Sequence, residues 1–194
     1  SFAHRPNPIS AAKAIHIGRA LCDGLSAIHA VGILHLNIHP GNIVLEGDTA
    51  ARLCDVSPVP EGGARSRRIG SQHELLGADP GYAAPEQMLG KPVSAGTDIY
   101  SLATVLYELV AGEPLWVGSS LAEIGLRKTR EEVQLPDRFP RALRRALQLA
   151  LSRDCTNRPE RAEDFGKLLG AGRGGAATTK SRASNGVGSC DITV

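Results

Sequence analysis

The sequence predicts an α+β domain that is mainly α-helical and contains one short β-hairpin. Apolar residues recur at a spacing of three and four over 10–30, which is typical of a helix with one buried face. Two short β-type runs follow at 43–45 and 51–54. Helical patterns return at 97–111, about 119–129, 141–152 and 160–169. With 42% hydrophobic residues in a chain of 194, a single domain with a buried core is expected.

The first predicted helix has a recognisable start. Residues 1–9 are polar and contain two prolines, so we expect an entry loop. Ser10 then suits the N-cap, because its hydroxyl can accept a hydrogen bond from a backbone N–H of the first turn. The apolar residues that define the buried face up to Ala30 are Ile17, Leu21, Leu25 and Ile28.

Turn and loop signals organise the rest of the chain. Residues 46–48, with the sequence E-G-D, separate the two β-type runs and predict a hairpin. Residues 57–81 are rich in proline, glycine, serine and arginine, which predicts a long exposed loop of the kind that is usually functional or disordered. Over 170–194 the composition changes to glycine, alanine, serine and threonine, which predicts a flexible tail.

Composition argues against several functions. The 22 basic and 20 acidic residues nearly cancel, so no overall field favours nucleic acid or a membrane surface, and the basic residues of the tail lack aromatic stacking partners. No apolar run is long enough to span a bilayer, and the first four residues do not begin a signal peptide. The four cysteines are far apart, which favours reduced thiols. We therefore expect a cytoplasmic domain without a nucleic-acid partner or direct membrane insertion.

One short stretch contains several polar residues that are typical of a catalytic loop. Residues 35–42, with the sequence H-L-N-I-H-P-G-N, resemble the H-R-D-L-K-P-x-N catalytic loop of Ser/Thr protein kinases. In that family the aspartate accepts the proton of the substrate hydroxyl, and the asparagine, here Asn42, holds magnesium. The aspartate position is occupied by Asn37, whose neutral amide cannot take a proton.

Further motifs follow in the order of the kinase family. Asp55 lies where the D-F-G motif would place its magnesium-binding carboxylate. Residues 84–86 form an A-P-E motif that would close the activation segment. The resemblance implies that Asp98 braces the catalytic loop from the central helix, and that Arg158 pairs with Glu86. The chain thus resembles the C-terminal lobe of a bacterial Ser/Thr kinase, a partial kinase domain over 1–169 followed by the tail.

The N-terminal lobe of a kinase has no counterpart in the sequence. Nothing before Ser10 supplies a glycine-rich loop, a strand-borne lysine or the helix glutamate that pairs with it. The G-x-G-x-x-G match at 170–175 lies in the predicted tail without a preceding strand, so we interpret it as low complexity. We expect either a fragment or a product whose N-terminal lobe is encoded upstream.

Several positions in the catalytic loop depart from the family. Leu36 replaces the arginine that binds a phosphorylated activation loop. His39 lies at the position of the lysine that contacts the phosphate, and a neutral histidine stabilises negative charge poorly. His35 is expected to be a buried, hydrogen-bonded core histidine. A metal pair of His35 and His39 is not favoured, since Pro40 and Gly41 predict a loop without further ligands.

Asp79 offers a speculative substitute for the missing base. It lies at the family's threonine position, and an Asp79–His39 carboxylate–imidazole pair would partly restore base function. The ordinary interpretation is an aspartate in a surface turn before Pro80. Both interpretations stay open at this point.

The sequence therefore favours a catalytically impaired kinase-like domain, a pseudokinase that acts as a binding or scaffold module for a protein partner. Asn42 and Asp55 would retain Mg·ATP binding once an N-terminal lobe is present. The alternative is an active Ser/Thr kinase that transfers the γ-phosphate of ATP to a protein substrate despite Asn37. A third hypothesis is a decayed kinase without a stable function. The expected binding surfaces are the groove around 77–90 and the helices beyond Trp116.

Overall fold

The computed structural model describes residues 8–47, 50–56, 59–60 and 79–171. Its α-helices are α1 (Ala11–Ala30), α2 (Pro85–Met88), α3 (Ala95–Ala111), α4 (Leu121–Arg130), α5 (Arg141–Ala150) and α6 (Ala162–Gly170). Its strands are β1 (Ile33–Leu34), β2 (Ile43–Glu46), β3 (Ala50–Leu53) and β4 (Val59–Pro60). Short 3-10 turns occupy Pro40–Asn42 and Cys155–Asn157.

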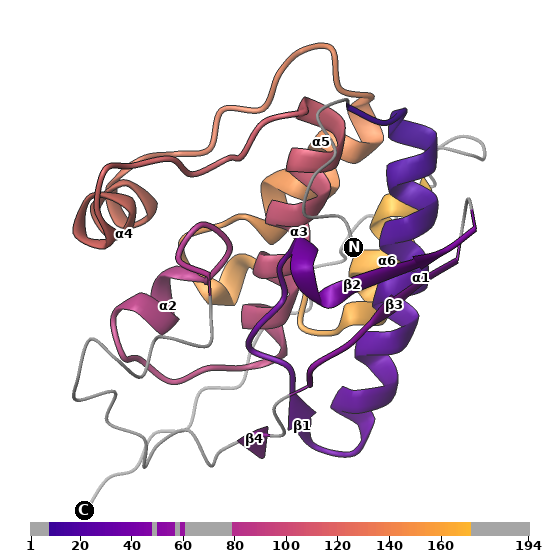
Figure 1. Cartoon of the computed structure of the whole chain (residues 1–194), viewed down its shortest axis with the longest axis horizontal. Coiled ribbons are helices and arrows are strands. Elements are labelled where there is room, and N and C mark those ends of the chain that lie inside the picture. Colours follow the sequence, from indigo (N-terminus) through magenta and orange to yellow (C-terminus); the bar gives the residue numbers. More distant parts are fainter. Residues whose placement is uncertain (1–7, 48–49, 57–58, 61–78, 172–194) are drawn as a thin grey trace, which may run out of the picture.

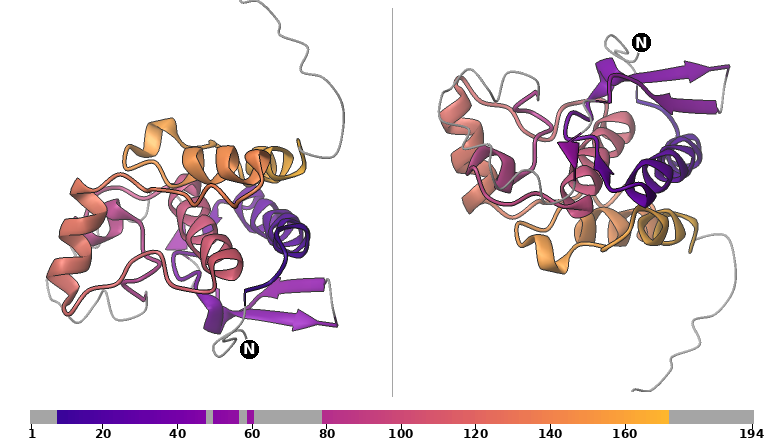
Figure 2. Two further views of the ribbon diagram at one scale, coloured as in Figure 1. Left: turned by 90° about the horizontal axis from the view of Figure 1, so that it is seen from above. Right: turned by 90° about the horizontal axis from the view of Figure 1, so that it is seen from below.

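The central helix of the fold is α3 (Figure 1). Both views in Figure 2 show α1 on one side of it, α4 on the other, and α5 with α6 across a third side. Every residue from Gly96 to Tyr107 is buried, so α3 has no solvent-facing stripe over most of its length. A helix that is apolar or buried all round belongs in the core.

Tight packing explains two glycines near this core. A Cβ at Gly18 of α1 would lie 2.8 Å from Cδ1 of Leu106 and 3.1 Å from Cδ1 of Leu169, so the glycine permits the close approach of α1 to α3 and α6. Gly112 ends α3 with a φ of 81°, and its N–H donates to the carbonyl of Glu108. This left-handed conformation suits glycine at a helix C-terminus.

Two small antiparallel sheets flank the helices. In the β2–β3 hairpin, Ile43 lies opposite Leu53 and Glu46 opposite Ala50. Figure 2 shows this hairpin on the side of the molecule opposite to α5 and α6. The second sheet pairs β1 with β4.

The helical periodicity predicted the long elements well. The expected helices at 10–30, 97–111, 119–129, 141–152 and 160–169 each correspond to one observed helix, with ends that differ by a few residues. Ser10 is the N-cap of α1, and its hydroxyl accepts a hydrogen bond from the N–H of Lys13. The short elements β1, β4 and α2 were not predicted, because two to four residues carry no measurable periodicity.

Some predictions fall largely outside the described residues. Of the loop predicted at 57–81, only 59–60 and 79–81 are described, and 59–60 form β4. Of the tail predicted at 170–194, only residues 170 and 171 are described, at the end of α6. No helix in the described part of the chain is both long and apolar enough to cross a membrane. Cys22, Cys54 and Cys155 are free thiols.

Candidate active-site loop and its supporting contacts

The loop between β1 and β2 is held by the carboxylate of Asp98. This side chain projects from the first turn of α3 and is fully buried. It accepts backbone hydrogen bonds from His35 (2.9 Å) and Leu36 (2.7 Å), and a third from Nε2 of His29 (2.8 Å). Leu36 has a φ of 58°, a strained conformation for a branched side chain. The contacts of Asp98 stabilise this strained residue at the start of the loop.

Gln87 connects the same loop to the segment before α2. Its Nε2 donates to the carbonyl oxygen of Leu36 at 2.9 Å, and its Oε1 accepts from the N–H of Ala84 at 2.9 Å. The side chain is buried, with 7% exposure. Sequence reasoning missed this residue. The only available signal was its place directly after A-P-E, in the first turn of a helix.

Asn37 and Asn42 are the two residues of the loop that the kinase resemblance places at the base and metal positions. Nδ2 of Asn42 donates to the backbone carbonyl of Asn37 at 3.0 Å. Oδ1 of Asn37 is buried, and no described residue donates to it. The loop therefore holds a buried amide oxygen at residue 37, and this group cannot take up a proton.

The open end of the β2–β3 hairpin places Asn42 near Asp55. The N–H of Cys54 donates to the carbonyl of Asn42 at 3.0 Å, which continues the hairpin pairing by one step. Asp55 follows with a φ of 56° and an exposed side chain. Nδ2 of Asn42 is a donor and binds the carbonyl of Asn37, so Oδ1 of Asn42 and the Asp55 carboxylate are the side-chain atoms that could bind a cation.

This donor set fits magnesium held jointly with a nucleotide. Magnesium usually takes one or two carboxylate-type ligands from the protein and completes its shell with water and phosphate oxygens. In the described part of the chain, no three His, Cys, Asp or Glu side chains come together as a metal site. An all-protein metal cage is thus not formed by these residues, whereas a site shared with phosphates matches Asn42 and Asp55.

His39 and Asp79 are each used locally and do not form a pair with one another. Nδ1 of His39 accepts a hydrogen bond from the N–H of Gly41 at 3.2 Å. Oδ1 of Asp79 accepts from the N–H of Gly81 at 2.8 Å, which is a turn contact. Neither a hydrogen bond nor an ion pair joins the two side chains, although both are described. The nearest ring to His39 is that of Tyr82, with centroids 6.4 Å apart.

His35 is buried as expected, but its ring lacks the expected hydrogen bond. The residue has no exposed surface, and neither ring nitrogen has a partner among the residues that the structure describes. Burial lowers the pKa of His35, against an opposing contribution from Asp98. The ring is consequently neutral and acts by packing. The sequence could not reveal this, because ring partners depend on the tertiary fold.

Glu86 and Arg158 form a buried ion pair behind the loop. Nη1 and Nη2 of Arg158 donate to the two carboxylate oxygens of Glu86 at 2.6 and 2.9 Å. The remaining guanidinium N–H groups reach backbone carbonyls, including those of Ser152 (2.8 Å) and Gly96 (3.1 Å). The hydroxyl of Thr97 also donates to Glu86. Because nearly every donor and acceptor is used, the pair rigidly joins α2, α3 and the chain before α6.

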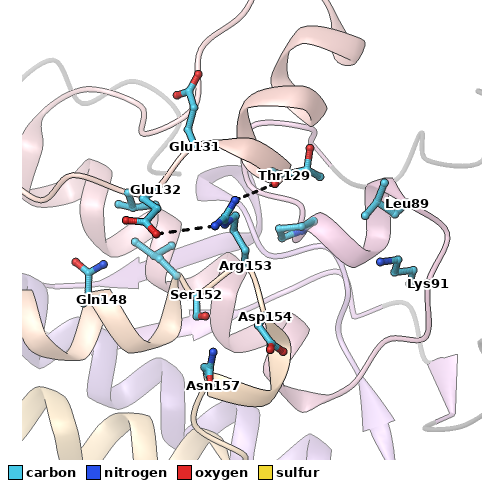
Figure 3. Close-up of a pocket in the computed structure, with 13 residues that line it drawn as sticks. Leu89, Lys91, Thr129, Glu131, Glu132, Gln148, Ser152, Arg153, Asp154 and Asn157 are labelled. Atoms are coloured by element: carbon cyan, nitrogen blue, oxygen red, sulfur yellow. Dashed lines mark hydrogen bonds and ion pairs between the residues drawn. The ribbon is translucent and has the colours of Figure 1, made fainter.

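A polar groove of about 550 Å³ lies away from the loop (Figure 3). Its walls come from α2, α4, α5 and the Cys155–Asn157 turn, and none of its lining residues belongs to 35–42. Arg153 spans it, donating to the carbonyls of Thr129 (3.2 Å) and Arg130 (3.1 Å) at the end of α4, with Glu132 nearby. The groove is therefore crossed by a helix-capping contact.

The mostly helical fold and the braced loop are those of a kinase-like domain. The sequence profile of the protein kinase domain matches residues 2–167. The chain is 31% identical to the serine/threonine-protein kinase PknB of Mycolicibacterium smegmatis over 137 residues, 71% of this chain and 22% of PknB. It is 29% identical to the serine/threonine-protein kinase PkaA of Streptomyces coelicolor over 171 residues, 87% of this chain and 31% of PkaA.

A third relative is the DNA damage-responsive serine/threonine-protein kinase RqkA of Deinococcus radiodurans. The identity is 31% over 162 residues, 81% of this chain and 24% of RqkA. The chain belongs to the protein kinase family and is of the bacterial Ser/Thr type. It spans less than a third of the length of these relatives.

Replacing Asp98 by alanine is expected to destabilise the domain by about 3 kcal/mol, because it leaves the buried N–H of His35 and the part-buried N–H of Leu36 without an acceptor. Urea unfolding of the complete protein measures this change. Asp23→Ala, an exposed aspartate on α1, is the control and should stay within about 0.5 kcal/mol of the native protein. Equal effects of the two variants would contradict the bracing role of Asp98.

Proposed function

We propose that the chain is the C-terminal lobe of a protein kinase domain with an impaired catalytic loop, and that it serves as a binding or scaffold module for a protein partner. The single observation that carries this proposal is Asn37. It lies at the base position of a loop whose supporting contacts, from Asp98, Gln87 and Asn42, are all formed. The loop keeps its shape and lacks its base.

The chemistry of the residues supports impaired transfer. Phosphoryl transfer depends mainly on positioning and charge stabilisation, to which magnesium contributes by neutralising phosphate charge. Asn42 and Asp55 would hold that ion. The neutral amide of Asn37 cannot remove the proton of a substrate hydroxyl, a step that commonly contributes about 10²–10⁴-fold, and its oxygen is buried in this structure. His39, whose Nδ1 accepts a hydrogen bond, does not replace the charge of a lysine.

The second candidate is an active Ser/Thr kinase. It is favoured by the relatives, which are named as serine/threonine-protein kinases, and by the two retained oxygen ligands. It requires a substitute for the base, and Asp79 is the candidate residue. Because the chain spans less than a third of the relatives' length, the activity of the whole protein is a proposal in either case.

The partner is proposed to be a protein that contacts the segment around residues 79–90. This segment contains the turn after Asp79 and α2, and Gln87 joins it to the loop. In an active kinase it would face the protein substrate, and in an impaired one it remains a shaped surface. Substrate and scaffold partner would thus use the same face.

Transfer of labelled γ-phosphate from Mg·ATP tests the proposal. The assay uses the complete protein that contains this chain. It is incubated alone, to detect phosphorylation of the protein itself, and with generic Ser/Thr protein substrates. An Asp55→Ala copy sets the background. Transfer by the native protein clearly above this background would overturn the proposal of impaired catalysis. It would support the second candidate, an active Ser/Thr kinase.

Binding of Mg·ATP is expected to depend on Asp55. Mg·ATP should raise the Tm of the complete native protein, because a ligand that binds only the folded state stabilises it. The Asp55→Ala variant should lose at least about tenfold in affinity, since a charge-bearing magnesium ligand is removed. Thermal shift and calorimetry with ATP, with and without magnesium, measure both. Equal Mg·ATP affinity in the two proteins would contradict the assignment of Asp55.

A further inference from the structure

Lys128 of α4 is a buried cation bound to main-chain oxygens. The residue has no exposed surface. Its Nζ donates to the carbonyls of Pro80 (2.6 Å), Gly81 (3.0 Å) and Ala83 (2.6 Å). No carboxylate lies within ion-pair distance of it in the described part of the chain. A lysine ammonium has three N–H donors, so the three contacts together use its full capacity.

Aromatic rings and one acid complete the surroundings of this ammonium. Nζ lies 5.8 Å from the centroid of the Tyr100 ring of α3 and 6.0 Å from that of Trp116. Burial lowers the pKa of Lys128 to about 7, against an opposing contribution from Asp79. The same Tyr100 ring also contacts Arg158, whose Cζ lies 4.8 Å from the ring centroid and which forms an ion pair with Glu86.

The helix that carries Lys128 is anchored by other contacts. Ser120 caps its N-terminus, and Arg153 donates to the last carbonyls of α4 (Figure 3). The segment 80–83 has contacts of its own. Its turn is closed by hydrogen bonds from the N–H groups of Tyr82 and Ala83 to the carbonyl of Asp79, and the hydroxyl of Tyr82 donates to the carboxylate of Glu108 on α3. Lys128 adds three bonds that join the main chain of this segment to a helix that is already fixed.

We propose that Lys128 is a positioning residue that holds the partner-facing segment 80–83 in one conformation. It acts through three main-chain carbonyls, so it sets the shape of this segment whatever side chains the segment presents. The partner-facing role of 80–83 rests on the proposed function, whereas its attachment to α4 does not. Loss of the ammonium opens the segment locally and leaves the helical core folded.

Hydrogen exchange in the complete protein tests this attachment. In the Lys128→Met variant, the amides of Tyr82 and Ala83 are expected to exchange about tenfold faster or more, because local opening no longer breaks charge-assisted bonds. Protection of α1 and the Tm should not fall, since methionine has similar length and removes a buried charge. The control is Arg130→Met, an exposed cation on the same helix. Unchanged exchange at 82–83, or an equal loss of protection in α1, would overturn the proposal.

A second variant covers the case in which Lys128→Met does not fold. Lys128→Gln keeps two N–H donors, and its exchange at residues 82–83 should fall between the native protein and full opening. Exchange equal to that of the native protein would overturn the proposal. These readouts need neither nucleotide nor partner, so they stay informative even if the proposed function fails.

Fluorescence of Trp116 gives a signature that a purely structural role would not produce. Trp116 is the single tryptophan of this chain, and any tryptophan elsewhere in the complete protein is replaced by phenylalanine. Its emission should titrate between about 7, the value that burial favours, and the ordinary 10.5 of a lysine. The transition should be missing from Lys128→Met and kept in Arg130→Met. A native protein without a Lys128-dependent transition would overturn the placement of the ammonium.

Discussion

The Asn37→Asp variant of the complete protein is expected to transfer the γ-phosphate of Mg·ATP about 10²–10⁴-fold faster than the native protein, the usual contribution of a general base. The substitution exchanges an amide for a carboxylate of the same shape. Asn42 bonds to the backbone carbonyl of residue 37, which the substitution does not alter. The loop should thus keep its conformation and regain a proton acceptor.

Two controls give this experiment its meaning. Asn37→Asp combined with Asp55→Ala should return to background, because the repaired base still needs the magnesium ligand. Asp79→Asn should leave the repaired enzyme unchanged, since no contact joins Asp79 to His39. If the native protein were as active as Asn37→Asp, the proposal that its phosphoryl transfer is impaired would be contradicted. If both were inactive while Mg·ATP still bound, the missing base would not be the limiting defect.

Arg158→Ala is expected to destabilise the domain by about 3–5 kcal/mol, because it leaves the carboxylate of Glu86 buried without its partner. The guanidinium side chain is fully buried and also binds the carbonyls of Ser152 and Gly96. Since single domains have a free energy of unfolding of only about 5–15 kcal/mol, this variant would lose a large part of its stability. Urea unfolding followed by fluorescence of Trp116 measures the effect.

The matched control is Arg144→Ala, whose side chain forms an exposed pair with Asp137. Such surface pairs contribute about 0–1 kcal/mol, so this variant should be close to the native protein. The double variant Glu86→Gln with Arg158→Met should be less damaged than Arg158→Ala, because no uncompensated charge stays buried. A loss below about 1 kcal/mol in Arg158→Ala would contradict a stabilising role for this pair.

Local signals explain which parts of the fold could be predicted. Ser10 could be named as a cap because N-cap bonds are made within three residues. The long helices could be placed because their buried faces repeat every three to four residues. The short strand β4 could not be predicted, because Val59 and Pro60 pair with β1, which lies far away in the sequence. The buried, unpartnered ring of His35 likewise depends on what the fold packs around it.

The candidate site divides in the same way. Asn37, Asn42 and Asp55 could be singled out from motif spacing alone. Gln87 and Lys128 could not, because their bonds join residues 51 and 45 positions apart in the chain. A lysine in an amphipathic helix is ordinarily exposed, so only the packing of α4 could reveal that Lys128 is buried.

The sequence by itself determined the protein family, the order of the helices and the presence of an asparagine at residue 37, where the kinase motif has an aspartate. These properties depend on residue identity and short-range periodicity, which the chain carries in any conformation. The tertiary structure decided which polar groups are satisfied, which ion pair is buried and how the segment 80–83 is attached. The reason is physical: the strength of a charge or a hydrogen bond depends on burial and on partners brought together from distant positions.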